Sequence, residues 1–158
     1  MTKIRTGIGV DVHKFKKGKG IILGGVYIPY IKSLKGYSDA DVLIHSIMDA
    51  LLGAVSLQDI GFYFPCSEPE YKNISSLLLL KRVCSLIKKK RFRIININSM
   101  ILAQEPKLST YREAMIKNVE EISGKDTFSV QFSTTEHLGF IGRKEGILSI
   151  TSVLVEKI

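Results

Sequence analysis

The chain has 158 residues, 45% of them hydrophobic and 24% charged, a composition typical of one globular domain with a buried core rather than of a disordered chain. Its most sustained apolar run, Leu77–Leu80, is far too short for a membrane helix, so we expect no membrane partner. The formal charge of +8 leaves nucleic acid, anionic lipid and phosphorylated metabolites open as partners, because charge alone does not choose among them.

The first residues lead directly into a strand-like segment without the apolar core of a signal peptide, so we expect a cytoplasmic protein. Cys66 and Cys84 are expected as free thiols, because a chain with an adequate core gains little from one disulfide. The basic run Lys88–Arg93 is interpreted as the solvated C-terminal end of a helix, where cations interact favourably with the helix dipole.

Two β-rich runs, residues 4–12 and 20–30, open the chain on either side of a loop rich in lysine and glycine. They predict a hairpin or two neighbouring strands. Within the first run Asp11 and His13 alternate with valines, so both polar side chains project from one face of the strand.

Apolar residues recur at helical spacing over residues 42–55, which predicts a helix with His45 on its first or second turn. The candidates for its cap or first turn are Ser38, Asp39 and Asp41. The remaining pattern predicts a loop with one short turn over 58–71, a helix over 75–89, a strand over 92–104, a helix within 108–124 capped by Ser109 or Thr110, and strands over 128–136 and 146–158.

The element order β-β-α-α-β-α-β-β mixes hairpins with crossovers. It predicts an α/β (α+β) sandwich in a single domain, residues 1–158, with one mixed sheet of about four main strands, helices on one face and an N-terminal hairpin. The other face of that sheet needs cover, and the amphipathic last strand is compatible with self-association.

Asp11, His13 and His45 form the first candidate site, because a strand carrying two of them can pack against the start of the helix that carries the third. Two histidines and a carboxylate with a fourth position open are typical of a reactive Zn²⁺ site, since structural sites usually fill all four positions with protein ligands. The D-x-H spacing alone is common, and a lone helix histidine is more often a satisfied polar residue. The residues by themselves leave both interpretations open.

Two later stretches concentrate groups that bind phosphate. "STTEHLGFIGRKEG" places hydroxyls, Glu136 and Arg143 at the end of a strand, where main-chain N–H groups bind phosphate oxygens and Glu136 can hold a harder cation such as Mg²⁺ or Mn²⁺. "AQEPKLS" places Lys107 in a turn beside a helix N-terminus, which favours anions. Ordinary turn chemistry also accounts for each stretch separately.

In order and spacing these motifs resemble the family of 2-C-methyl-D-erythritol 2,4-cyclodiphosphate synthases. The similarity is carried by "GVDVH", "ILGGVYIPY", "SDADVLIHSIMDALLGA", "DIGFYFP", "AQEPK" and "TTEHLGFIGRKEGI". The resemblance implies a phosphorus–oxygen lyase of non-mevalonate isoprenoid biosynthesis, which converts 4-diphosphocytidyl-2-C-methyl-D-erythritol 2-phosphate into the cyclic diphosphate and releases CMP. It also implies a homotrimer with active sites between subunits and no nucleic-acid partner.

The resemblance implies a role for each matched residue. Asp11, His13 and His45 would bind Zn²⁺, Glu136 would support Mg²⁺ or Mn²⁺ on the diphosphate, and Tyr37 and Thr134 would stabilise the transition state. The implied substrate contacts are Asp11, Val12, His13, Tyr37, Ser38, Asp59, Ile60, Gly61, Phe64, Pro65, Cys66, Ser67, Glu68, Ala103, Gln104, Glu105, Pro106, Lys107, Leu108, Ser109, Ser133, Thr134, Thr135, Glu136, Phe140 and Arg143. Arg143 and Glu145 also match charged groups around a central channel that can hold an isoprenoid diphosphate.

Three positions depart from the family pattern. Tyr37 stands where the family usually has histidine, and its neutral hydroxyl cannot supply the charge of an imidazolium. Cys66 replaces a loop carboxylate, and His137 replaces a usual Lys or Arg. We expect the fold and the metal ligands to be intact and the rate to differ.

Two other functions are compatible with the residues. A basic module that binds RNA or another polyanion would use Lys88–Arg93 as its main surface and would need no metal. A metal-dependent phosphohydrolase would keep the metal, use water as the nucleophile and release a linear product.

Overall fold

A five-stranded mixed sheet underlies the structure, a computed structural model that describes residues 3–158. Across the sheet the strands run in the order β4 (Lys32–Leu34), β1 (Ile4–Lys17), β7 (Gly146–Lys157), β5 (Phe92–Leu102) and β6 (Phe128–Ser133). Neighbouring strands are antiparallel except β5 and β6, which are parallel. A separate antiparallel hairpin consists of β2 (Gly20–Leu23) and β3 (Val26–Pro29). The predicted sandwich class with a mixed sheet and an N-terminal hairpin is confirmed.

The pairing of the first strands differs from the expectation. Strand β1 pairs with β7 along most of its length and continues to Lys17, because Phe15 pairs with Leu34 on β4. The run over 20–30 folds back on itself instead of pairing with β1. Its turn lies at Gly24 and Gly25, whose φ angles of 57° and 70° fall in the left-handed region that glycine adopts without steric cost.

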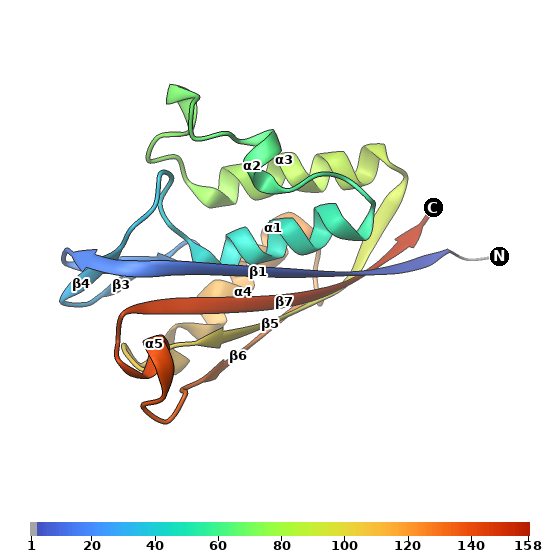
Figure 1. Cartoon of the computed structure of the whole chain (residues 1–158). Coiled ribbons are helices and arrows are strands. Elements are labelled where there is room, and N and C mark those ends of the chain that lie inside the picture. The colour runs from blue at the N-terminus through green and yellow to red at the C-terminus, as the bar shows by residue number, and fades with distance from the viewer. Residues whose placement is uncertain (1–2) are drawn as a thin grey trace.

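Helices cover one face of the sheet (Figure 1). The longer ones are α1 (Val42–Ala54), α3 (Ser76–Lys89) and α4 (Arg112–Ser123), and the short ones are α2 (Ile60–Tyr63), α5 (Gly139–Gly142), η1 (Pro69–Tyr71) and η2 (Ser109–Tyr111). Helix α4 begins later than expected: the predicted caps Ser109 and Thr110 lie in η2, and Tyr111 precedes α4 without a side-chain capping bond. Within residues 3–158, none of the helices has the length and hydropathy needed to cross a membrane.

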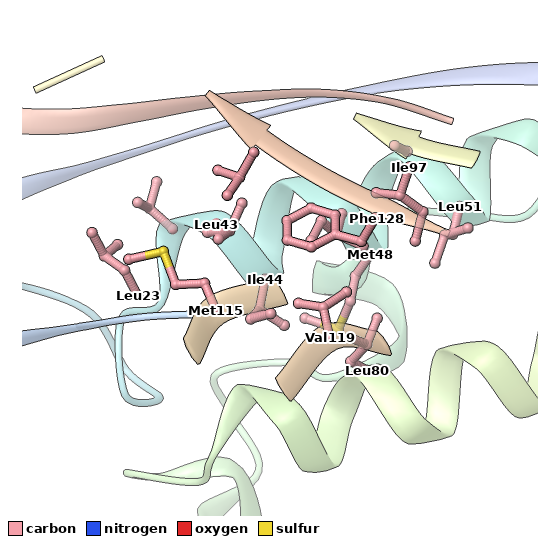
Figure 2. Close-up of a cluster of buried hydrophobic side chains, with 14 of the residues drawn as sticks. Leu23, Leu43, Ile44, Met48, Leu51, Leu80, Ile97, Met115, Val119 and Phe128 are labelled. Atoms are coloured by element: carbon pink, nitrogen blue, oxygen red, sulfur yellow. The ribbon is translucent and has the colours of Figure 1, made fainter. Parts of the chain in front are cut away.

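The hydrophobic core lies between the helices and the inner face of the sheet. Leu43, Ile44 and Met48 of α1 are completely buried, and they lie among Leu80 of α3 and other apolar side chains (Figure 2). Helix α1 is buried on almost every side, since it contacts both β1 and α3. Each such side chain contributes about 1.5–3 kcal/mol to stability on burial.

Strand β1 and helix α1 meet through their main chains. A Cβ atom at Gly7 would lie 2.0 Å from the carbonyl oxygen of Ala50, and one at Gly9 would lie 2.0 Å from that of Ser46. Contact this close excludes any other residue at both positions. Buried hydroxyls fill the space beside it: Ser46 Oγ lies 2.8 Å from Ser149 Oγ and 2.7 Å from Thr151 Oγ1.

The opposite face of the sheet is open to solvent in the described chain and carries an apolar patch on β1 and β7. Ile8, Val10 and Val12 of β1 are 70%, 52% and 45% exposed, and Ile150 of β7 extends the patch. Exposed apolar side chains that adjoin on one surface usually mark a contact with another molecule. The predicted uncovered face is therefore present.

Candidate active site

Asp11, His13 and His45 converge as the sequence predicts. Asp11 Oδ2 lies 2.9 Å from His13 Nε2 and 3.1 Å from His45 Nδ1, and these two ring nitrogens are 3.1 Å apart. Among residues 3–158, these three are the one group of His, Cys, Asp or Glu residues whose ligand atoms all lie within 4.8 Å of one another.

The start of α1 is fixed by Asp41, and this places the turn that carries His45. The buried Asp41 carboxylate accepts hydrogen bonds from the main-chain N–H groups of Ile44, Gly24 and Gly25 at 3.1, 3.0 and 2.7 Å. Its role as the N-cap confirms one of the three predicted candidates. Burial raises the pKa of Asp41 to about 6. The same carboxylate joins the β2–β3 turn to the helix.

Charge and burial oppose each other at Asp11 and His13. Burial acts to raise the pKa of Asp11, but the hydrogen bonds with His13 and His45 outweigh it and hold the pKa of that carboxyl well below its usual range. Burial acts to lower the pKa of His13, but the hydrogen bond and charge of Asp11 outweigh it and raise that pKa. The Asp11 carboxylate is therefore available as an anionic oxygen ligand throughout the neutral range.

The three ligand atoms fit a tetrahedral divalent cation. Zinc with bonds of about 2.0–2.1 Å requires ligand atoms about 3.3 Å apart, because the edge of a tetrahedron is about 1.6 times the bond length. The observed separations are 2.9, 3.1 and 3.1 Å. Two imidazole nitrogens and one carboxylate oxygen are also the donor set that zinc accepts.

A pocket of about 230 Å³ opens beside these ligands. Its lining consists of Asp11, His13, Tyr37, Ser38, His45, Met48, Ile60, Gly61, Phe64, Cys66, Tyr71 and Leu79, and it is called the metal pocket below. Tyr37 connects the pocket to the following loop, because its hydroxyl donates to the carbonyl oxygen of Glu68 at 3.2 Å and its own carbonyl accepts from the N–H of Asn73 at 2.9 Å. Both cysteines are free as predicted, and Cys66 is exposed at this pocket.

A second pocket of about 430 Å³ lies at the ends of β5 and β6. It is called the nucleotide pocket below, after the nucleotide part of the substrate that the resemblance implies. Its lining consists of Ile101, Ala103, Gln104, Glu105, Pro106, Lys107, Leu108, Ser109, Phe132, Ser133, Thr134 and Glu136. The predicted segment from Ala103 to Ser109 lines it without a gap. The two stretches that the sequence marked for phosphate binding are thus brought together.

Side-chain contacts hold the two turns of the nucleotide pocket together. Gln104 Oε1 accepts a hydrogen bond from the N–H of His137 at 3.0 Å, and the Thr134 hydroxyl donates to Glu136 at 3.2 Å. Glu105 forms an ion pair with Lys144 at 2.6 Å. Thr134 and Glu136 are exposed, so their hydroxyl and carboxylate are accessible to a ligand.

The chain does not bring the two pockets into one site. They share no lining residue, and β7 lies between β1 and β5. The implied substrate contacts that line neither pocket are Val12, Asp59, Pro65, Ser67, Glu68, Thr135, Phe140 and Arg143. Of these, Asp59 caps α2 through the N–H of Phe62 at 3.0 Å, and Arg143 pairs with Glu145 at 2.8 Å.

Sequence reasoning missed the groups behind the two histidines. His13 Nδ1 lies 2.6 Å from the carbonyl oxygen of Lys35, and His45 Nε2 lies 3.0 Å from the buried hydroxyl of Ser76. Ser76 in turn contacts Asp39. No sequence signal marks these contacts, because a main-chain carbonyl has no signature and Ser76 has the appearance of an ordinary residue at a helix start.

Comparison with known proteins gives consistent matches. The model of the YgbB family matches residues 4–156. The 2-C-methyl-D-erythritol 2,4-cyclodiphosphate synthase of Chlorobium phaeobacteroides is 47% identical over 155 residues, which are 97% of this chain and 98% of that one.

Solved structures resemble the fold over its whole length. The bifunctional IspDF from Campylobacter jejuni superposes with a TM-score of 0.95 at 41% identity, covering 100% of this chain and 43% of that chain, so this chain spans less than half of that protein. The IspF of Plasmodium falciparum in its CDP complex superposes with a TM-score of 0.85 at 36% identity and covers 98% of this chain and 96% of that chain.

Proposed function

The chain belongs to the YgbB family of 2-C-methyl-D-erythritol 2,4-cyclodiphosphate synthases, and from this membership we propose how its residues carry the family's reaction. The enzyme converts 4-diphosphocytidyl-2-C-methyl-D-erythritol 2-phosphate into the cyclic diphosphate and CMP, a step of isoprenoid biosynthesis. An oxygen of the 2-phosphate attacks the β-phosphorus while the bond from that phosphorus to the CMP oxygen breaks. No water is consumed, which makes the reaction that of a phosphorus–oxygen lyase.

A divalent metal site serves this chemistry, and we assign it to Asp11 Oδ2, His13 Nε2 and His45 Nδ1 as a Zn²⁺ site. The metal supplies a Lewis acid for phosphoryl oxygen when bound. The protein's own contribution is to hold three ligands in a preformed triangle on the wall of a pocket. The convergence of these three side chains is the observation that carries the proposal.

The nucleotide pocket is proposed to bind the cytidine diphosphate portion of the substrate. Its exposed hydroxyls of Ser133 and Thr134 and the Lys107 ammonium suit phosphate oxygens, and Glu136, which lines the same pocket, is proposed to hold Mg²⁺ or Mn²⁺ on the diphosphate. Thr134 supports the transition state from this pocket and Tyr37 from the metal pocket. A solved relative in complex with CDP supports the nucleotide assignment.

The separation of the two pockets leads us to propose a homotrimer in the cytoplasm, built from one synthase domain of residues 1–158. A substrate that needs both pockets is served when the metal pocket of one subunit faces the nucleotide pocket of its neighbour. The apolar patch of Ile8, Val10 and Val12 supplies a surface for that contact. Arg143 and Glu145 are proposed to border a central channel that takes an isoprenoid diphosphate.

The alternative functions are less well supported. Lys88 and Lys89 occupy the last turn of α3, as expected for a solvated helix end, so a polyanion-binding surface is not needed to explain them. A phosphohydrolase would use the same metal pocket, and its product distinguishes it.

The test is incubation of metal-replete protein with 4-diphosphocytidyl-2-C-methyl-D-erythritol 2-phosphate, with ³¹P NMR to follow the products. We expect CMP and the cyclic diphosphate in equal amounts. Asp11→Asn should lower turnover by roughly 10³-fold, because a metal site contributes several kcal/mol to transition-state stabilisation. A linear phosphorylated product would show hydrolysis instead, and no turnover in the metal-replete wild type would refute the assignment.

A further inference from the structure

His45 has a second set of contacts on the side of the ring away from Asp11. Its Nε2 atom lies 3.0 Å from Ser76 Oγ, and Ser76 Oγ lies 2.5 Å from Asp39 Oδ1. The three residues come from α1, from the first position of α3 and from the segment before α1. Ser76 is completely buried, so this contact is shielded from water.

The direction of each hydrogen bond follows from Asp39. A carboxylate can only accept, so the Ser76 hydroxyl donates its single proton to Asp39 Oδ1. The main-chain N–H of Ser76 donates to the other oxygen of Asp39, Oδ2, at 2.8 Å. This second hydrogen bond fixes the position of the carboxylate relative to the Ser76 hydroxyl. Ser76 Oγ can then only accept from His45, so Nε2 of that imidazole carries a proton. The ring atom left to bind a metal ion is Nδ1, which faces Asp11 and His13.

Ser38 does not determine this arrangement. Its hydroxyl oxygen lies 3.1 Å from the same Nε2 atom and 3.4 Å from the N–H of Ala40. A hydroxyl without a fixed acceptor can rotate to donate or to accept, so Ser38 tolerates either position of the His45 proton. Ser76 is compatible only with a proton on His45 Nε2, because its own hydroxyl proton is donated in the hydrogen bond to Asp39.

We propose that Ser76, held by Asp39, is a positioning residue that keeps the proton of His45 on Nε2 and so presents Nδ1 as a metal ligand. This rests on the ligand assignment proposed above. His13 is oriented in a parallel way, because the carbonyl oxygen of Lys35 at 2.6 Å fixes a proton on Nδ1 and leaves Nε2 for the metal. The carbonyl oxygen of Lys35 thus orients His13, and Ser76 together with Asp39 orients His45.

The first test measures zinc affinity by competition with a chromophoric chelator. Ser76→Ala and Asp39→Asn should each bind zinc about 10- to 100-fold more weakly, the usual cost of removing a group that orients a ligand. Ser75→Ala is the matched control, because Ser75 is the exposed neighbouring residue and its side chain makes no capping bond. Circular dichroism at the assay temperature establishes that each variant is folded. Affinity of Ser76→Ala and Asp39→Asn within twofold of the wild type would overturn the proposal.

The second test reads the proton directly, which a merely structural role of Ser76 would not affect. The chain has three histidines, so ¹⁵N-histidine labelling gives a spectrum that His45→Gln assigns. In zinc-loaded wild type we expect the His45 proton on Nε2 with slow solvent exchange, and in Ser76→Ala we expect exchange at least about tenfold faster. A proton on Nδ1, or equal exchange rates, would overturn the proposal. A wild type that binds no zinc would instead refute the ligand assignment, so the two failures are distinguishable.

Discussion

The metal pocket and the nucleotide pocket are held in opposite ways. The ligands of the metal pocket lie on β1 and α1, whose main chains touch at Gly7 and Gly9 beneath buried hydroxyls. The nucleotide pocket is built on two exposed turns, joined by single contacts such as Gln104 with His137. The fold thus places the candidate metal ligands on closely packed main chain and the candidate nucleotide-binding groups on surface turns.

The difference also shows what one chain lacks. The metal pocket contains Asp11, His13 and His45, and the nucleotide pocket contains the segment from Ala103 to Ser109, but neither includes a residue of the other. Their separation is the strongest argument for active sites between subunits.

The largest effect is expected from mixing two inactive variants, His45→Ala and the double variant Thr134→Ala, Glu136→Ala. In every mixed trimer one of the three sites between subunits combines an intact metal pocket with an intact nucleotide pocket, so about a third of wild-type turnover should return. CMP release by co-expressed, doubly tagged protein measures it. A mixture of His13→Ala with His45→Ala is the control and should stay inactive. Absence of recovery in the first mixture would place both pockets' functions within single chains.

Two glycine variants test the close main-chain packing of β1 against α1, which holds the metal pocket. Gly9→Ala should destabilise the fold by about 3 kcal/mol or more, because the new Cβ would lie 2.0 Å from the Ser46 carbonyl and 2.7 Å from the Ala50 nitrogen. Gly53→Ala in α1 meets nothing within 4 Å and should stabilise by about 0.5–1 kcal/mol. Urea denaturation measures both, and equal effects would contradict the close main-chain packing.

Variants of Tyr37 test whether a positive charge at this position of the metal pocket would increase turnover. Tyr37→His should raise turnover by about tenfold, because a hydrogen bond from an imidazolium is stronger than one from a neutral phenol by about 1–1.5 kcal/mol. Tyr37→Phe removes only the hydroxyl that donates to Glu68 and should lower turnover a few-fold. Steady-state kinetics with both variants gives the comparison. Unchanged turnover in both would remove Tyr37 from the chemistry.

The smallest effect is expected from CDP on the chemical labelling of Cys66, a residue of the metal pocket. Cys66 should react with a maleimide at least about a hundredfold faster than Cys84, since burial raises the pKa of Cys84 to about 12. CDP should slow the labelling of Cys66 a few-fold, although Cys66 lines only the metal pocket, because in the proposed trimer a neighbouring subunit brings the nucleotide close. Mass spectrometry of each thiol measures the rates, with Cys84 as the internal reference. Labelling unaffected by CDP would argue against the shared site.

The sequence predicts which side of a strand or helix a residue lies on better than it predicts which strands pair with each other. Alternation in β1 is sufficient to place Asp11 and His13 on one side, and helical spacing is sufficient to place His45, so the convergence of these three side chains is predicted correctly. The partner of β1 is β7, more than a hundred residues later, and no local periodicity carries that information. The contact between Asp39 and Ser76 was missed for the same reason, since each residue locally resembles a helix cap.

The main-chain contact between β1 and α1 also affects how this protein can change over evolutionary time. The span between the two strand ligands and the helix ligand is set by carbonyl and amide atoms, which every amino acid has in common, rather than by the sizes of particular side chains. Substitutions among the surrounding leucines, isoleucines and valines therefore alter stability without changing the distances among Asp11, His13 and His45. Divergent descendants can keep the same spacing of Asp11, His13 and His45 while many core residues change, provided that Gly7 and Gly9 persist.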